Sequence, residues 1–406
     1  MEHHSPDKNY IKMLEDYEGS VVVFGDAAFT QLSARILLDG NSILLLITGG
    51  QNSYMKSGAY QAFINMALGI DGIETPLYQG VPAEPDVACV RDIVKMMNDV
   101  KPDTVAALGG GSVLDAAKAA YLSWQTGLDV TELFGVNVAS ERFPGKEFKR
   151  VSCIPTTAGT GSEVTPYANI VDREKDLKFL IADQQMVPDL ALIDPGFTKS
   201  MPPALTAATA LDAMTHAVES LLNSRAGHPE GEEWALESIR LIRYALPRVL
   251  ENPEDLLCRE MLAAAATLAG MCIRFRPTAL PHLCSYSMWG KVPHGLAVAL
   301  LLPHFWRYYL AGDDDAIRTQ TMKLAGIFAS ENEQKTPEDV VRACEDFIAK
   351  VSPYKKLAEI EDFDANLVKK IAADAAKNPV KLQTAPRSVP VEEAADILNG
   401  ILSKAL

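Results

Sequence analysis

The first 200 residues alternate between short apolar runs and longer segments with helical spacing, and this alternation limits the fold more than any other feature. Apolar runs at 20–25, 42–48 and 104–111 each end at or beside glycine. Between them lie helical patterns such as 85–100, whose apolar residues fall on one face. Strands that alternate with helices predict a parallel sheet covered on both faces, which binds ligands at the carboxyl ends of its strands.

The pattern changes near residue 200. The segments 202–223, 234–250 and 259–273 are rich in Ala and Leu with helical spacing, and β-branched runs nearly vanish. We therefore predict two domains: an α/β domain over 1–199 and an all-helical domain over 200–406.

Composition excludes several classes of function. The net charge is −15 and there is no long Lys/Arg run, which argues against a nucleic-acid partner. No uninterrupted apolar run approaches the roughly 18 residues that span a bilayer, so we expect no membrane segment. The six scattered cysteines include no CxxC pair and fit reduced thiols. The beginning of the sequence does not resemble a secretory signal, and we expect a cytoplasmic protein.

Two loops have the composition of phosphate-binding loops. Gly109, Gly110, Gly111 and Ser112 follow a predicted strand and open a helix, where exposed amides and the helix N-terminus favour an anion. The hydroxyl-rich loop 153–163 follows another apolar run, so its side chains are expected at the same sheet edge. Alternatively, the first loop is a tight strand-to-helix turn and the second a capped helix start. Their combination favours binding of phosphate and ribose.

Four residues of the second domain have the chemistry of metal ligands. Asp212 and His216 are four apart on a predicted helix and therefore share one face, and His282 and His294 follow later. One carboxylate and three imidazoles suit Fe(II), with Zn(II) as the alternative, acting as a Lewis acid. The alternative for Asp212 and His216 is an ordinary pair on a helix surface.

Four segments together resemble the signatures of the iron-containing (group III) metal-dependent alcohol dehydrogenases. The resemblance covers roughly residues 20–310, with the signatures in the family's order and spacing. The segments are GGGSVLDAAK (109–118), PTTAGTGSE (155–163), ALDAMTHAVES (210–220) and VPHGLAVALLLPH (292–304).

The resemblance implies an oxidoreductase with an α/β N-terminal dinucleotide-binding domain and an all-α C-terminal metal-binding domain, an architecture shared with dehydroquinate synthase. It places catalysis in the cleft between the two domains, and such folds commonly form homo-oligomers. The metal ligands would be Asp212, His216, His282 and His294. The cofactor contacts would include Gly110, Gly111, Ser112, Asp115, Thr156, Thr157, Thr160 and Lys178.

The sequence departs from the family pattern at two places. His282 and His294 enclose 11 residues, two fewer than in many members. Many members also carry a further histidine four positions after the third ligand, near the nicotinamide, and Tyr286 stands there instead. A proton relay through that histidine is therefore absent.

The end of the second predicted strand bears on the cofactor. An acidic residue there would bind the ribose hydroxyls of NAD and repel a 2′-phosphate, but Gly49 and Gly50 occupy the place, followed by Ser53. The stretch resembles the glycine-pair loop of the family's NADPH-using aldehyde reductases. We predict NADPH, with NADH as the alternative, and contacts from these three residues. A flexible turn is the alternative structural interpretation.

The segment 274–286 bears on the substrate. It resembles segments of family members that reduce phosphonoacetaldehyde. Arg274 and Arg276 precede a predicted ligand and could bind an anionic group, with Tyr286 close by. The alternative is that both arginines cap a helix end or face solvent. We predict a small anionic aldehyde, and a neutral short-chain aldehyde or alcohol is the alternative.

Two other classes of function remain possible from the sequence. A dehydroquinate synthase-type lyase uses NAD and zinc, but the loop TTAGTGSE and the glycines after the second strand argue against it. An inactive scaffold that kept the fold is the second alternative, because the segment between two predicted ligands is shortened.

Overall fold

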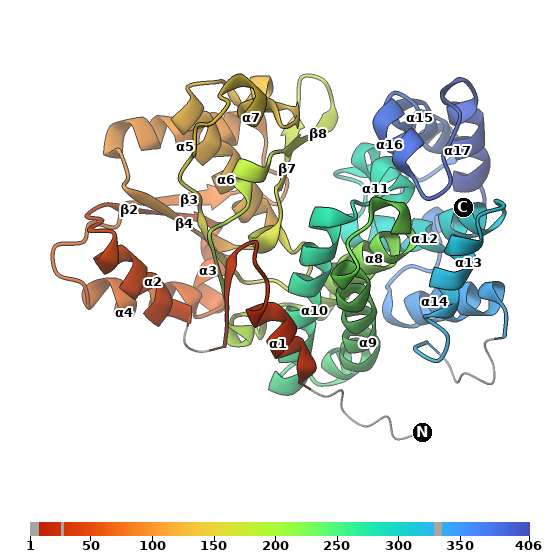
Figure 1. Ribbon diagram of the computed structural model, residues 1–406, viewed down its shortest axis with the longest axis horizontal. Helices are drawn as coiled ribbons and strands as arrows, with labels where there is room; N and C mark the ends of the chain where they lie inside the picture. Colours follow the sequence, from red (N-terminus) through yellow and green to blue (C-terminus); the bar gives the residue numbers. More distant parts are fainter. Residues whose placement is uncertain (1–7, 26–27, 329–334) are drawn as a thin grey trace. The chain divides into compact units, whose positions relative to one another are not determined.

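The computed structural model describes residues 8–25, 28–328 and 335–406. Within them the chain forms two compact units, Lys8–Met201 and Pro202–Leu406 (Figure 1). The sequence places the domain boundary at residue 200, and the two units divide at Pro202. The first unit is an α/β fold and the second is helical, which confirms the predicted fold class.

A six-stranded parallel sheet forms the centre of the first unit, in the order β1-β9-β6-β4-β2-β3. Side chains of a strand alternate between the two faces, and β2 shows this directly: Leu45 and Ile47 enter one core and Leu44 and Leu46 the other. A strand buried on both faces reads as a continuous apolar run. The strands are β1 (Val21–Phe24), β2 (Leu44–Gly49), β3 (Leu77–Val81), β4 (Thr104–Gly109), β6 (Ser152–Pro155) and β9 (Leu190–Ile193).

Helices cover both faces of this sheet (Figure 1). One core contains α5 (Val87–Val100) and α6 (Gly111–Thr126), and the other contains α2 (Ala28–Leu38) and α4 (Ala59–Leu68). Asp86 begins α5 by accepting a bond from the backbone N–H of Cys89 at 2.9 Å. Further elements are α1 (Asn9–Glu15), α3 (Gln51–Lys56), α7 (Val138–Arg142) and a small sheet of β5 (Gly135–Val136), β8 (Leu177–Ala182) and β7 (Tyr167–Asp172).

The second unit is built on three long helices, α8, α9 and α10, that pack on one another, with α12 also packed on α8. The predicted helices at 202–223, 234–250 and 259–273 correspond to the first three of these. The helices are α8 (Pro203–Leu222), α9 (Glu230–Glu251), α10 (Leu256–Phe275), α11 (Leu280–Ser285), α12 (His294–Leu310), α13 (Asp315–Met322), α14 (Pro337–Val351), α15 (Ala365–Ala375), α16 (Pro379–Thr384) and α17 (Ala394–Leu402).

The helix α10 is long and apolar enough to cross a membrane by composition alone, with a mean hydropathy of 1.6 in its most apolar window. However, 83% of that window is buried inside the protein, where α10 packs on α8 and α9. Its apolar character is therefore that of a helix buried in the protein core.

Candidate active site

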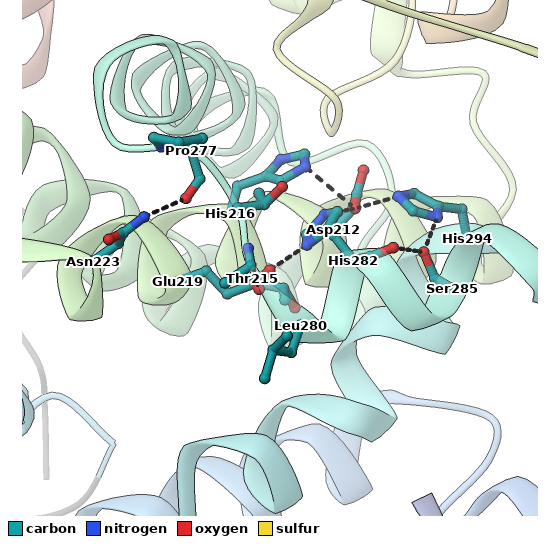
Figure 2. Close-up of polar contacts among 12 residues, drawn as sticks. Asp212, Thr215, His216, Glu219, Asn223, Pro277, Leu280, His282, Ser285 and His294 are labelled. Atoms are coloured by element: carbon teal, nitrogen blue, oxygen red, sulfur yellow. Dashed lines mark hydrogen bonds and ion pairs between the residues drawn. The ribbon is translucent and has the colours of Figure 1, made fainter. Parts of the chain in front are cut away.

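The helical unit brings the predicted metal ligands together. The Oδ1 atom of Asp212 lies 3.6 Å from Nε2 of His282, 3.6 Å from Nε2 of His294 and 3.7 Å from Nε2 of His216 (Figure 2). Ligand atoms of Asp212, His282 and His294 all lie within 4.8 Å of one another. The carboxylate oxygen is thus the point on which three imidazoles converge.

Three helices supply these side chains. Asp212 and His216 lie one turn apart on α8, His282 lies on the short helix α11, and His294 is the first residue of α12. The start of α12 can reach α8 because Gly295 has no side chain: a Cβ atom there would lie 1.9 Å from the carbonyl oxygen of Ala208. The close approach places His294 beside Asp212 despite the shortened segment before it.

Two buried polar atoms at the centre of the cluster have no hydrogen-bond partner among the described residues: Oδ1 of Asp212 and Nε2 of His282. Each such atom costs about 1–3 kcal/mol unless something compensates it. A divalent cation between them would provide that compensation, and one carboxylate with imidazoles matches the ligands of Fe(II) or Zn(II). The residues present therefore fit a bound metal ion.

The protonation states also suit a metal. Burial alone would raise the pKa of Asp212, but the neighbouring imidazoles, His216 first, hold that pKa well below the usual range of an aspartate. Burial lowers the pKa of His216 to about 4. At neutral pH the first residue is therefore a carboxylate and the second a neutral imidazole, the forms that bind cations.

Glu219, which the sequence interpretation missed, orients His282. Its carboxylate is fully buried, accepts a bond from the backbone N–H of Ala279 at 2.9 Å, and contacts Nδ1 of His282 through its other oxygen (Figure 2). Burial would lower the pKa of His282, but the two carboxylates of Glu219 and Asp212 together outweigh burial and raise this pKa. With Nδ1 held by Glu219, Nε2 of His282 faces Asp212.

Ser285 orients His294 as Glu219 orients His282. Its hydroxyl lies 3.2 Å from Nδ1 of His294 and donates to the backbone carbonyl of His282 at 2.8 Å. The two histidines are thereby tied to each other, with Nε2 of His294 left on the side of Asp212.

The two candidate phosphate loops of the first unit are in contact. β4 and β6 are parallel neighbours, with Gly109 opposite Pro155, and the backbone N–H of Thr156 donates to the carbonyl of Gly109 at 2.9 Å. A Cβ atom at Gly111 would lie 2.5 Å from Cγ2 of Thr160, and one at Gly110 would lie 3.2 Å from Thr157. The glycines are therefore needed for two loops to share one sheet edge at the N-terminus of α6.

Asp115, on α6, accepts hydrogen bonds from the hydroxyl-rich loop and from β7. One of its carboxylate oxygens accepts a bond from the hydroxyl of Ser162 at 2.5 Å, and the other from the backbone N–H of Asn169 at 2.9 Å. Lys118 donates to the carbonyl of Ser162 at 2.9 Å. Burial raises the pKa of Asp115. These contacts favour a positioning role for Asp115 rather than the direct cofactor contact that the resemblance implies.

The remaining predicted cofactor residues lie at the same strands or beside them. Gly49 ends β2, where a Cβ atom would lie 3.3 Å from the side chain of Val113, and Gly50 precedes the first residue of α3. Lys178, on β8, pairs with Glu84 at 2.6 Å, and Ser112 donates to the carbonyl of Ala83. The side chain of Ser53 lies outside the described residues.

The three residues predicted to bind substrate, Arg274, Arg276 and Tyr286, differ from one another in their contacts. Arg276 is buried, with 3% of its surface exposed, and its side chain lies against Gly231 in the first turn of α9. The guanidinium of Arg274 lies 5.1 Å from the ring centre of Phe275. Tyr286 follows α11 directly, four residues after His282, and the ammonium of Lys381 lies 5.4 Å from its ring centre.

The α/β unit with its glycine-rich sheet edge and the helical unit with its carboxylate–imidazole cluster define a metal- and dinucleotide-binding class of protein. Comparison with known families agrees. Residues 19–195 match the iron-containing alcohol dehydrogenases, and residues 206–402 match the C-terminal part of the Fe-containing alcohol dehydrogenase family. The chain belongs to this family and is an oxidoreductase of the alcohol dehydrogenase class.

Individual relatives give the same assignment. The chain is 32% identical over 284 residues to the bifunctional aldehyde-alcohol dehydrogenase AdhE of Escherichia coli, covering 68% of this chain but 31% of that protein. It is 30% identical to 1,3-propanediol dehydrogenase of Klebsiella pneumoniae, over 84% of this chain and 85% of the relative. The alcohol dehydrogenase from Oenococcus oeni superposes with a TM-score of 0.84 at 26% identity, over 95% of this chain and 98% of the other.

Proposed function

We propose that this protein interconverts small aldehydes and alcohols with a nicotinamide cofactor and a divalent metal, Fe(II) before Zn(II). The observation that carries the proposal is the buried pair of unpartnered atoms on Asp212 and His282, with further imidazoles directed at the same carboxylate. Membership of the alcohol dehydrogenase family favours this reaction over a lyase reaction.

We assign the residues to metal binding, to orientation of the imidazoles and to cofactor binding. Asp212, His282 and His294, with His216 as the fourth ligand, would hold the metal, while Glu219 and Ser285 keep two of the imidazoles oriented. When bound, the metal supplies a Lewis acid for the carbonyl oxygen and the nicotinamide supplies or accepts the hydride. The edge formed by Gly110, Gly111, Thr156, Thr157 and Thr160 would bind the dinucleotide through amides and hydroxyls. The location of catalysis between the domains stays a prediction.

NADPH is the cofactor that we favour over NADH. β2 ends at Gly49, and the sequence from there to Ile70 contains no Asp or Glu. The segment after this strand therefore has no carboxylate that would repel the 2′-phosphate of NADPH. We also propose a cytoplasmic location and a homo-oligomeric state.

The substrate is proposed to be a small aldehyde, with an anionic aldehyde such as phosphonoacetaldehyde favoured over a neutral one. The arginines that suggested this class are weaker support in the structure, because Arg276 is buried against α9. A neutral short-chain aldehyde or alcohol remains the alternative substrate.

The test is oxidation of NADPH and NADH by the Fe(II)-loaded protein with neutral and anionic aldehydes. His216→Ala and His294→Ala should each abolish turnover and lower the bound metal. His304→Asn, on the same helix as His294, is the matched control and should retain both. Turnover by metal-free His294→Ala would refute the role of the metal. Bound metal with no activity on any aldehyde would refute the proposed reaction and favour an inactive scaffold.

A further inference from the structure

Lys381 lies beside the metal cluster, although the sequence separates it from every other residue of the site. It is in the first turn of α16, where the side chain of Asn378 accepts a bond from its backbone N–H at 3.0 Å. The next residue, Leu382, is fully buried. α16 packs on α11, the helix that carries His282. The backbone of Lys381 is thereby fixed near a metal ligand.

The ammonium group extends along the chain segment that presents His282. Its Nζ atom donates to the hydroxyl of Thr278 at 3.1 Å and lies 5.4 Å from the ring centre of Tyr286. Thr278 and Tyr286 stand four residues before and four residues after His282. His282 and Tyr286 are one helical turn apart at the end of α11, so an ammonium at the Tyr286 ring lies close to the turn that carries the metal ligand.

No carboxylate neutralises this ammonium within the described parts of the chain, where its contacts are a hydroxyl and an aromatic ring. Lys377 is a clear contrast. It is four residues earlier, and it pairs with Asp374 at 2.7 Å and is 70% exposed. A partly buried cation without a counter-ion beside a metal cluster is suited to hold a negative charge that arrives with a ligand.

We propose that Lys381 binds the anionic group of a small aldehyde substrate whose carbonyl lies at the Asp212–His282–His294 cluster. This inference rests on the proposed function and narrows its substrate class to aldehydes with a carboxylate, sulfonate or phosphonate a few atoms from the carbonyl. The contacts to Thr278 and Tyr286 keep the ammonium in place before the substrate binds, so less side-chain freedom is lost on binding.

Substrate selectivity provides the first test. We compare kcat/KM of the wild type, Lys381→Gln and Lys381→Arg for sulfoacetaldehyde, phosphonoacetaldehyde and succinic semialdehyde with that for propanal. Lys381→Gln should lower the values for the anionic aldehydes by about ten-fold or more and change propanal by less than about two-fold. Lys381→Arg should retain most of the preference, and Lys377→Gln all of it. Increasing salt should reduce the preference of the wild type. Responses that differ among the three anions identify which anionic group is recognised.

Binding of unreactive anions provides a readout that does not depend on turnover. Calorimetry with ethanesulfonate, ethylphosphonate and propionate should show weaker binding by metal-loaded Lys381→Gln than by the wild type or Lys377→Gln. An equal loss of activity on propanal and on anionic aldehydes would overturn the inference, because it indicates a structural role. Anion binding that is unchanged in Lys381→Gln, or absent from the wild type, would also overturn it.

The two proposals fail in different ways. If the wild type reduces propanal and Lys381→Gln has the same selectivity, the inference is wrong and the oxidoreductase function stands. If no aldehyde is reduced but anion binding depends on Lys381, the oxidoreductase proposal is wrong and the anion site stands.

Discussion

Glu219 shows at the scale of single residues how the metal site is built. The side chain reaches a metal ligand from the same helix face as Asp212 and His216, seven and three residues after them. It holds Nδ1 of His282 and so leaves Nε2 for the metal. A buried carboxylate in this place is costly unless its oxygens are occupied, and both of them are.

Glu219→Gln keeps the shape of the side chain and removes its charge. An amide supports the metal-bound imidazole less well, so we expect affinity for Fe(II) or Zn(II) to fall by about 10- to 100-fold. The check is competitive metal titration against a chelator. Glu237→Gln is the matched control, since Glu237 is also a buried glutamate on a long helix but pairs with Arg240 at 2.6 Å. Equal metal affinity of Glu219→Gln and the wild type would contradict the orienting role.

The sequence indicates the candidate metal ligands more clearly than the residues that orient them. Asp212 and His216 have a local signal, because a spacing of four places both on one helix face. The same periodicity extends to Glu219, so that residue could have been found. Ser285 has no such signal, because its contact with His294 depends on how the chain folds between α11 and α12. The burial of Arg276 against α9 was equally invisible in the local sequence.

At the scale of elements, the close packing of α12 on α8 controls where His294 lies. Gly295 allows it: a Cβ atom there would lie 1.9 Å from the backbone oxygen of Ala208 and 2.8 Å from Cβ of Asp212. Backbone cannot give way as a flexible side chain can, so any added atom must push the two helices apart.

Gly295→Ala should therefore destabilise the helical unit by at least about 2 kcal/mol and reduce metal binding, because His294 moves away from Asp212. The measurements are the thermal unfolding midpoint and metal content. Gly400→Ala, inside α17, serves as control: a Cβ atom there meets nothing within 4 Å, and alanine should be neutral or slightly stabilising. An unchanged metal content in Gly295→Ala would show that α12 does not need this close approach.

Local patterns predicted most elements, because strands buried on both faces read as apolar runs and helices as apolar stripes. The contact between the two candidate phosphate loops could also be predicted, since neighbouring parallel strands end at one edge of a sheet. The position of α16 could not be predicted in this way. The contact of Lys381 with Thr278 joins residues 103 positions apart, and no periodicity in either segment encodes it.

At the scale of the whole molecule, the two candidate sites belong to different compact units. The glycine-rich edge is entirely within Lys8–Met201, and the carboxylate–imidazole cluster is entirely within Pro202–Leu406. Every contact described above that positions a residue of one site comes from the same unit. Each unit should therefore form its own site without help from the ligand of the other.

Two variants test this independence. In Gly111→Ala the new Cβ would lie 2.5 Å from Cγ2 of Thr160, so the loop contact is disturbed and NADPH binding should weaken by about ten-fold or more, while metal content stays at the wild-type level. His294→Ala should show the reverse, with metal lost and NADPH binding retained. Fluorescence titration of NADPH and metal analysis of both proteins measure the two properties separately. Because the reaction needs both sites, His294→Ala should lack turnover, and Gly111→Ala should have a higher KM for NADPH. If either variant lost both NADPH binding and bound metal, the two sites would be coupled. The independence inferred from their separate contacts would then be wrong.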